Sequence, residues 1–232
     1  MTSGDSLDRL TREIETCRRC PRLVAWREQV ALEKRASYAA WDYWGRPVAG
    51  FGDPAAQLLV LGLAPAAHGA NRTGRVFTGD RSGDWLFRAL YRAGFANQPT
   101  SVSSDDGLAL HDCYVAAAVR CAPPANKPSP DERNACLPYL RREIDLLPNT
   151  RVLLALGHFA YDVAAKEFDV ARPRPRFGHG ATAAGRRPDG GPLTIVCSYH
   201  PSQQNTFTGT LTEAMFDAVM GECRRQLVER PG

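Results

Sequence analysis

The chain has 232 residues, of which 44% are hydrophobic, and this is enough for one sizeable buried core. It contains no apolar run of about 18 residues, and its polar N-terminus lacks the apolar region of a signal peptide, so we expect a cytoplasmic protein without a membrane span. The net charge of +4 is a mild excess of base, compatible with a polyanionic partner without identifying one.

In chain order, apolar strand-like runs alternate with helical patterns four times. This alternation is typical of an α/β domain with a short parallel sheet that helices cover on both faces. We expect one domain over residues 1–232, with three layers (α/β/α) around a sheet of about four mostly parallel strands. The expected helices lie within 7–35, 82–93, 131–147, 158–168 and 211–228, and the expected strands at 57–62, 113–119, 151–156 and 193–198.

Local signals set several of these boundaries. Ser129 followed by Glu132 is a capping-box pattern with Pro at the first helical position, so it predicts the start of a helix. Ser82 or Asp84 is expected to cap the helix that runs to residue 93. Residues 36–56 are rich in aromatic residues, Gly and Pro, which indicates irregular packing against the body.

Two long loops follow the apolar runs at 57–62 and 193–198, and they carry unusual residues. The loop at 62–80 includes Phe77 and Asp80, and the loop at 200–212 begins with His200 and a proline. Because the carboxyl ends of parallel strands meet at one edge of a sheet, we expect these loops to form the two walls of one pocket. Asp80 has an alternative interpretation as a helix cap, and Phe77 has one as a core residue.

The seven cysteines of a cytosolic chain are not expected to form a disulfide framework. Cys17 and Cys20 form a Cys-x2-Cys turn, which suits a metal or a cluster, and Cys121 and Cys136 are placed so that they can converge in space. An asymmetric set of four thiolates suits a [4Fe–4S] cluster at least as well as zinc. The alternative is a chance pair with ordinary core cysteines. The other three are expected in the core: Cys113, Cys197 and Cys223.

Residues 169–192 hold five arginines against two aspartates, amid Pro and Gly. Such a segment is either a solvated insertion or an arm that faces phosphates. The general excess of Arg over Lys in this chain is explained by a GC-rich genome, so it does not decide between the two.

Together these motifs resemble those of the type-5 (B-type) uracil-DNA glycosylases, iron–sulfur members of the uracil-DNA glycosylase superfamily. The resemblance runs from about residue 10 to 225. The matching residues are GLAPAAHGANRTGRVFTGD at 62–80, HPSQQNTFTGTLT at 200–212, CRRC at 17–20, RCAPPANKP at 120–128, and Cys136. Related branches carry a polar residue where this chain has Ala64 and an asparagine near Ala117. Because it lacks both polar residues, this chain resembles the type-5 branch rather than the type-4 branch. This difference implies looser base recognition.

The resemblance implies a monofunctional enzyme that excises uracil and other deaminated bases, such as hypoxanthine and xanthine, and so initiates base excision repair. It also implies a [4Fe–4S] cluster, a monomer, and double- or single-stranded DNA with damaged bases as the partner. The sequence offers no suitably placed lysine that would indicate a lyase step. The cluster would tie the N-terminal helical segment to the body, with the ligands Cys17, Cys20, Cys121 and Cys136.

In this interpretation Asp80 supports the cationic sugar or orients water, and His200 donates a hydrogen bond to the base. Phe77 stacks on the flipped base. Asn126 either contacts the base or forms an Asx turn. Asn71 and Arg72 brace the first loop or touch phosphate. The loop that enters the minor groove and fills the vacated space contains Ser202, Asn205, Thr208 and Gly209.

Two other classes of protein compete with this interpretation. A non-catalytic iron–sulfur protein that binds DNA or senses damage would need neither Asp80 nor His200 at the edge of a pocket. A nucleotide-binding α/β protein is disfavoured because the first loop lacks both glycine-rich phosphate-binding patterns.

Overall fold

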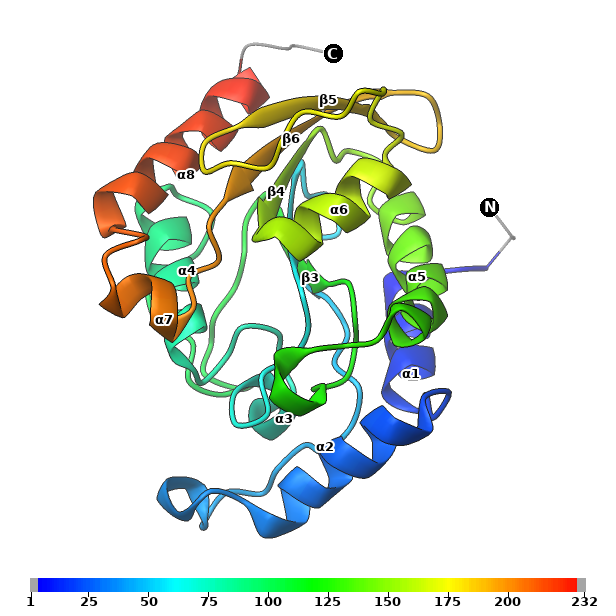
Figure 1. The fold of residues 1–232 in the computed structure, drawn as a ribbon, viewed down its shortest axis with the longest axis vertical. Coiled ribbons are helices and arrows are strands. Elements are labelled where there is room, and N and C mark those ends of the chain that lie inside the picture. The colour runs from blue at the N-terminus through cyan, green and yellow to red at the C-terminus, as the bar shows by residue number, and fades with distance from the viewer. Residues whose placement is uncertain (1–3, 229–232) are drawn as a thin grey trace.

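A sheet of six strands runs through the part of the chain that the computed structural model describes, residues 4–228 (Figure 1). Its strands are β1 (Phe51–Gly52), β2 (Leu58–Gly62), β3 (Cys113–Ala117), β4 (Val152–Leu156), β5 (Thr182–Arg186) and β6 (Pro192–Ser198). Their spatial order is β1-β3-β2-β4-β6-β5. The four inner strands are parallel, and each edge strand is antiparallel to its neighbour.

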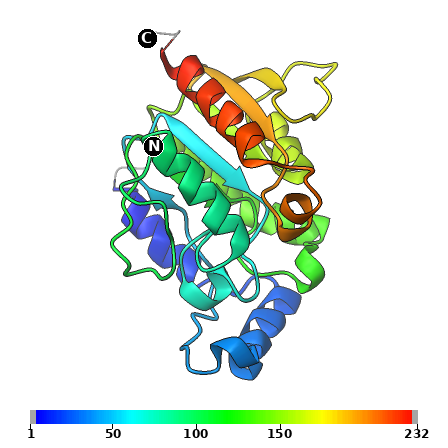
Figure 2. The same cartoon turned by 90° about the vertical axis from the view of Figure 1, so that its left-hand side faces the viewer.

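Helices cover both faces of the sheet, as expected for three layers (Figure 2). The helices are α1 (Leu7–Glu15), α2 (Pro21–Glu33), α3 (Ala70–Thr73), α4 (Arg81–Arg92), α5 (Pro130–Asp145), α6 (His158–Glu167), α7 (Gln203–Phe207) and α8 (Glu213–Val228). Two 3-10 turns also occur, η1 (Ala36–Tyr38) and η2 (Pro124–Asn126). One core lies under α4 and α8, and the other lies under α5 and α6.

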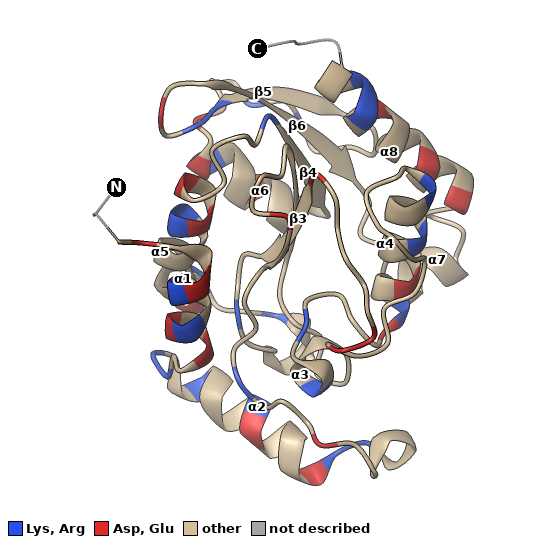
Figure 3. Cartoon of the chain, turned by 180° about the vertical axis from the view of Figure 1, so that it is seen from behind, with Lys and Arg blue, Asp and Glu red and all other residues tan. Residues whose placement is uncertain are grey.

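The inner strands β2, β3 and β4 are buried along their whole length because they have helices on both sides. Consequently they carry no charged residue, and the charges gather on the outer helices (Figure 3). Ion pairs tie two of these helices together, Arg88 with Glu213 and Arg92 with Asp217, each at 2.7 Å.

The expectation of about four strands was wrong at both edges of the sheet. β1 is only two residues long and lies in the segment expected to be irregular. β5 lies in the arginine-rich segment and is built from small residues, with Ala183 and Gly185 inward. Since neither strand contains an apolar run, the pattern that revealed the inner strands could not reveal them.

Helix starts follow capping chemistry. The capping box of Ser129 and Glu132 is confirmed, and Pro130 is the first residue of α5. The expectation that Ser82 or Asp84 caps α4 was wrong, because α4 begins one residue earlier and Asp80 is its N-cap.

The N-terminal helices lie side by side with the body rather than within the sheet layers (Figure 1). Leu10 and Ile14 of α1 pack against Tyr139 of α5, and Arg142 of α5 pairs with Asp5. Among residues 4–228, no helix is both long enough and apolar enough to cross a membrane.

Candidate active site

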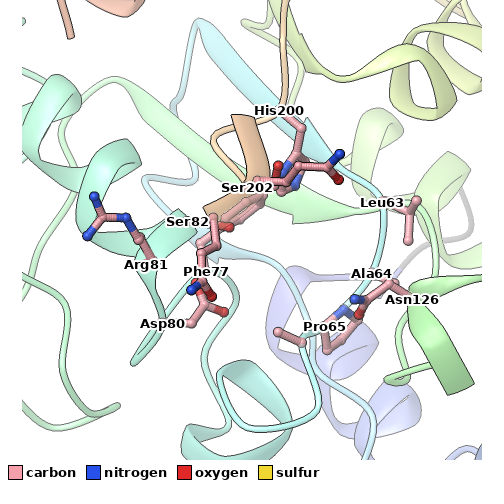
Figure 4. Close-up of a pocket in the computed structure, with 13 residues that line it drawn as sticks. Leu63, Ala64, Pro65, Phe77, Asp80, Arg81, Ser82, Asn126, His200 and Ser202 are labelled. Atoms are coloured by element: carbon pink, nitrogen blue, oxygen red, sulfur yellow. The ribbon is translucent and has the colours of Figure 1, made fainter. Parts of the chain in front are cut away.

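A pocket of about 470 Å³ opens where the two motif loops leave the carboxyl ends of β2 and β6 (Figure 4). The two loops therefore form one pocket, as the sequence predicts. The lining residues are Leu63, Ala64, Pro65, Ala66, Phe77, Asp80, Arg81, Ser82, Asn126, His200, Ser202, Gln203 and Gln204.

Phe77 lies across the end of β2 because Gly62 leaves room for its ring. A Cβ on Gly62 would approach Cε2 and Cζ of Phe77 to 2.6 Å. Phe77 also has a φ of 53°, a left-handed conformation that is costly for an aromatic residue. The structure therefore holds this ring at the pocket at some conformational cost, which is typical of functional positions.

Asp80 uses its two carboxylate oxygens differently. Oδ1 accepts a hydrogen bond from the N–H of Gly83 at 3.0 Å and so caps α4. Oδ2 lies next to Gly69, where a Cβ would come within 2.1 Å of it. Burial raises the pKa of Asp80, although the N–H groups of Gly83 and Ser82 act in the opposite direction. The carboxylate is thus a poorly solvated anion that gains from any positive charge placed near it.

His200 lies beside Phe77, with ring centroids 5.9 Å apart and planes 30° from parallel. Its imidazole makes no hydrogen bond to any residue in the described range, whereas its carbonyl oxygen accepts one from Nδ2 of Asn205 at 2.9 Å. Burial lowers the pKa of His200 to about 4. The ring is therefore neutral at physiological pH, with one N–H to donate to a ligand.

Asn126 faces this group from another wall, next to Ala64 and Pro65 (Figure 4). Asn126 has a φ of 56°. Its side-chain amide has no hydrogen-bond partner among residues 4–228, so the side chain does not form an Asx turn. Ala64 lines the pocket with a methyl group alone. The pocket thus offers one unoccupied amide and no second polar side chain on this wall.

The remaining residues of the second loop divide between lining and support. Ser202 lines the pocket and caps α7, since its Oγ accepts from the N–H of Asn205 at 3.3 Å. Asn205 does not line the pocket and instead holds the backbone of His200.

Asn71 and Arg72 are buried and brace the first loop, as one of the two expectations had it. Nδ2 of Asn71 donates to the carbonyl of Arg27 at 3.2 Å, and Arg72 donates to the carbonyls of His68 and Gly79. Because Arg72 is only 3% exposed, it has no access to a phosphate.

Sequence reasoning missed Arg81, Ser82, Gln203 and Gln204 as pocket residues. Arg81 donates from Nε to Oγ1 of Thr206 at 3.2 Å, and its guanidinium lies 4.5 Å from the ring centre of Phe207. Its position directly after Asp80 was the signal in the sequence. Its role at the rim depends on the packing of α7 against the start of α4.

Away from this pocket, the four motif cysteines line a small enclosure together with three arginines and Tyr139. Each is a free thiol. Nη1 of the buried Arg27 donates to Sγ of Cys121 at 2.9 Å, and Nε of Arg27 has no partner among the described residues. Within residues 4–228, no three His, Cys, Asp or Glu side chains lie close enough together to hold a single metal ion.

Comparison with known proteins gives the class of this molecule. Residues 49–224 match the model of the uracil DNA glycosylase superfamily. A type-5 uracil-DNA glycosylase of Mycobacterium tuberculosis is 50% identical over 95% of this chain and 81% of its own length. The type-5 uracil-DNA glycosylases of Mycobacterium leprae and Thermus thermophilus are 48% and 49% identical, over 97% and 91% of this chain and 98% and 94% of their own lengths.

The chain therefore belongs to the uracil DNA glycosylase superfamily, a family of enzymes. Within it, the chain groups with the type-5 members. A type-4 uracil-DNA glycosylase of Archaeoglobus fulgidus is only 29% identical over 72% of this chain. This agrees with the type-5 assignment made from Ala64 and Ala117.

Proposed function

We propose that this protein hydrolyses the N-glycosidic bond of uracil in DNA and leaves the strand intact. The observation that carries the proposal is the meeting of Asp80, Phe77 and His200 around one pocket, together with membership of a family of glycosylases. In the reaction water adds to C1′ of the sugar, the bond from C1′ to the base nitrogen breaks, and the base leaves with the bonding electrons.

Access to this pocket requires the target nucleotide to leave the helical stack, at a cost of a few kcal/mol. Phe77 offers a ring face that recovers part of this cost by stacking on the base. His200 is tilted only 30° from that ring, so its edge can meet a base that lies on Phe77.

Bond breaking places positive charge on the sugar and negative charge on the base. Asp80 stabilises the sugar cation through Oδ2, because Oδ1 is the oxygen that caps α4. Alternatively, Oδ2 holds the attacking water. A carboxylate with a pKa raised by burial gains more from this charge than a solvated one does, since its ground state is poorly stabilised.

On the base, the neutral His200 N–H donates to a carbonyl oxygen as that oxygen becomes negative. Asn126 supplies the second polar contact from the opposite wall. Because Ala64 adds no donor or acceptor, the wall that carries Asn126 tests the identity of the base with one amide alone. We therefore propose that hypoxanthine and xanthine are also substrates, and that the enzyme initiates base excision repair as a cytoplasmic monomer.

We further propose that Cys17, Cys20, Cys121 and Cys136 hold a [4Fe–4S] cluster. The support is the lining they share and the charge of Arg27, which is 2% exposed and whose one acidic partner among the described residues is the surface carboxylate of Glu28, at 3.8 Å. A buried cation of this kind calls for an anionic neighbour, and four thiolates around a cluster supply one. The cluster would contribute a rigid tie between α2 and α5.

The competing function is a non-catalytic iron–sulfur protein that binds DNA or senses damage. The deciding experiment incubates the protein with duplex oligonucleotides that carry uracil, hypoxanthine or xanthine, and then treats them with alkali to cut at abasic sites. Strand breaks at the position of the modified base support the glycosylase. Tight binding of all three duplexes without breaks would overturn it in favour of the sensor.

A further inference from the structure

A second hollow, of about 420 Å³, opens at the start of α6, beside the active-site pocket. Gly157, the residue before α6, lies against His200, because a Cβ on Gly157 would be 3.3 Å from that of His200. The two hollows therefore lie close to one another at the carboxyl edge of the sheet, although they share no lining residue. The second hollow is lined by His158, Tyr161, Asp162, Arg174, Pro175, Arg176 and Phe177.

The two arginines of this hollow have no acidic partner among the described residues. Arg174 and Arg176 are exposed and make neither a hydrogen bond nor an ion pair with any residue of the described chain. The one acid in the lining, Asp162, lies 3.4 Å from His158 of the same helix. By contrast, Arg187 at the far end of the same segment pairs with Asp189.

Aromatic rings form the floor between the arginines and the active site. The ring centre of Phe177 lies 5.4 Å from that of His158 and 6.2 Å from that of Tyr199, the neighbour of His200. The segment is fixed here, because the Tyr161 hydroxyl donates to the carbonyl of Pro175 at 2.5 Å. Figure 1 shows this segment returning past α6 before it enters β5.

We propose that this hollow binds the nucleotide next to the flipped one, with its phosphate on Arg174 and Arg176 and its base against the exposed ring of His158. The inference rests on the proposed function and adds a defined subsite to it. Guanidinium groups that lack protein partners match a phosphodiester, and ring faces beside them match an unstacked base. The short separation from the active-site pocket, seen in the approach of Gly157 to His200, favours the DNA strand itself over a free anion.

The test measures binding of a uracil duplex by fluorescence anisotropy across a range of salt, with Arg174→Ala, Arg176→Ala and His158→Ala. Arg12→Ala is the matched control, since Arg12 is also exposed and has no ion pair but lies on α1. Because both arginines contact the same phosphate, the two substitutions together are expected to lower the slope of log affinity against log salt by about 0.9, the value for one phosphate, and each alone by part of that. His158→Ala is expected to weaken binding roughly five-fold or more without changing that slope.

A second measurement identifies the phosphate. Neutral methylphosphonates are placed one at a time on either side of the uracil, and at one position the loss of affinity seen with the wild-type protein should vanish in Arg174→Ala. If both arginine variants match Arg12→Ala in affinity and salt slope, the subsite is wrong. Uracil excision from the same duplex by the wild-type protein, read by alkali cleavage at the abasic site, would show that the proposed function survives that failure.

Discussion

At the scale of single residues, Asp80 combines a structural and a chemical task. Asp80 lines the pocket, its Oδ1 caps α4, and its Oδ2 lies against Gly69. Asp80→Asn keeps a good N-cap, so the free energy of unfolding should change by about 0.5 kcal/mol or less. Single-turnover excision should fall roughly 10²- to 10⁴-fold, about 3–5 kcal/mol, because the lost interaction belongs to the transition state.

The matched control is Asp84→Asn, which removes an exposed carboxylate one turn further along α4. It should excise uracil at the wild-type rate. Affinity of Asp80→Asn for an abasic product should change far less than its rate. Wild-type rates from Asp80→Asn would return this residue to the cap alone, and the search for the catalytic acid would move to His68.

His200 makes the stability of the protein depend on pH. Its pKa is about 4 in the folded protein against 6.5 in the unfolded chain, so the unfolded chain takes up the proton first. The contribution of neutral His200 is therefore fully present above pH 6.5 and is lost as the pH falls toward 4, by roughly 3 kcal/mol in all. Urea unfolding of wild type and His200→Gln at a series of pH values measures it. Parallel curves for the two proteins between pH 6.5 and 4 would contradict the lowered pKa.

At the scale of elements, the apolar runs predicted all four inner strands, and the capping box predicted the start of α5. These signals are local, so the sequence displays them directly. The sequence did not predict β5, because its inward residues are Ala and Gly. It did not predict α7, because the residues of that helix lie in a loop whose composition is typical of turns. Intrinsic strand propensity and hydrophobic pattern do not predict a strand whose formation depends on pairing with a neighbouring strand.

The residues of the candidate site likewise fall into two groups, those that local sequence signals predict and those that long-range contacts place. Phe77, Asp80 and His200 could be placed together in advance, because each follows a strand that ends at one edge of the sheet. Arg81 and Gln204 could not, because their place at the rim depends on contacts such as that of Arg81 with Thr206, 125 residues away in the chain. Asn126 was expected from its place in the Pro-rich loop after Cys121, and it lies at the pocket with a left-handed backbone.

At the scale of the whole molecule, two sets of contacts hold the N-terminal helices. α1 has its own apolar contacts and the ion pairs of Arg142 with Asp5 and Glu13. α2 contacts the body at the cysteine enclosure, where Leu23 and Arg27 meet Cys121 and Cys136, and through the ion pair of Arg22 with Glu132 of α5. Loss of a cluster at this point should therefore loosen α2 far more than the layers of the sheet.

Cys17→Ala tests this dependence. With the proposed cluster, the wild-type protein should be brown and contain roughly four iron atoms per chain, and the purified variant should lose both. Hydrogen exchange should speed up in α2 while α4 and α8 keep their protection, since they share a different core. Cys223→Ala is the control, because Cys223 is also a free cysteine but lies buried in α8, so this variant should keep its iron and lose protection only there. A colourless wild-type protein that contains one zinc would overturn the iron–sulfur assignment, and unchanged exchange in α2 would refute the tie.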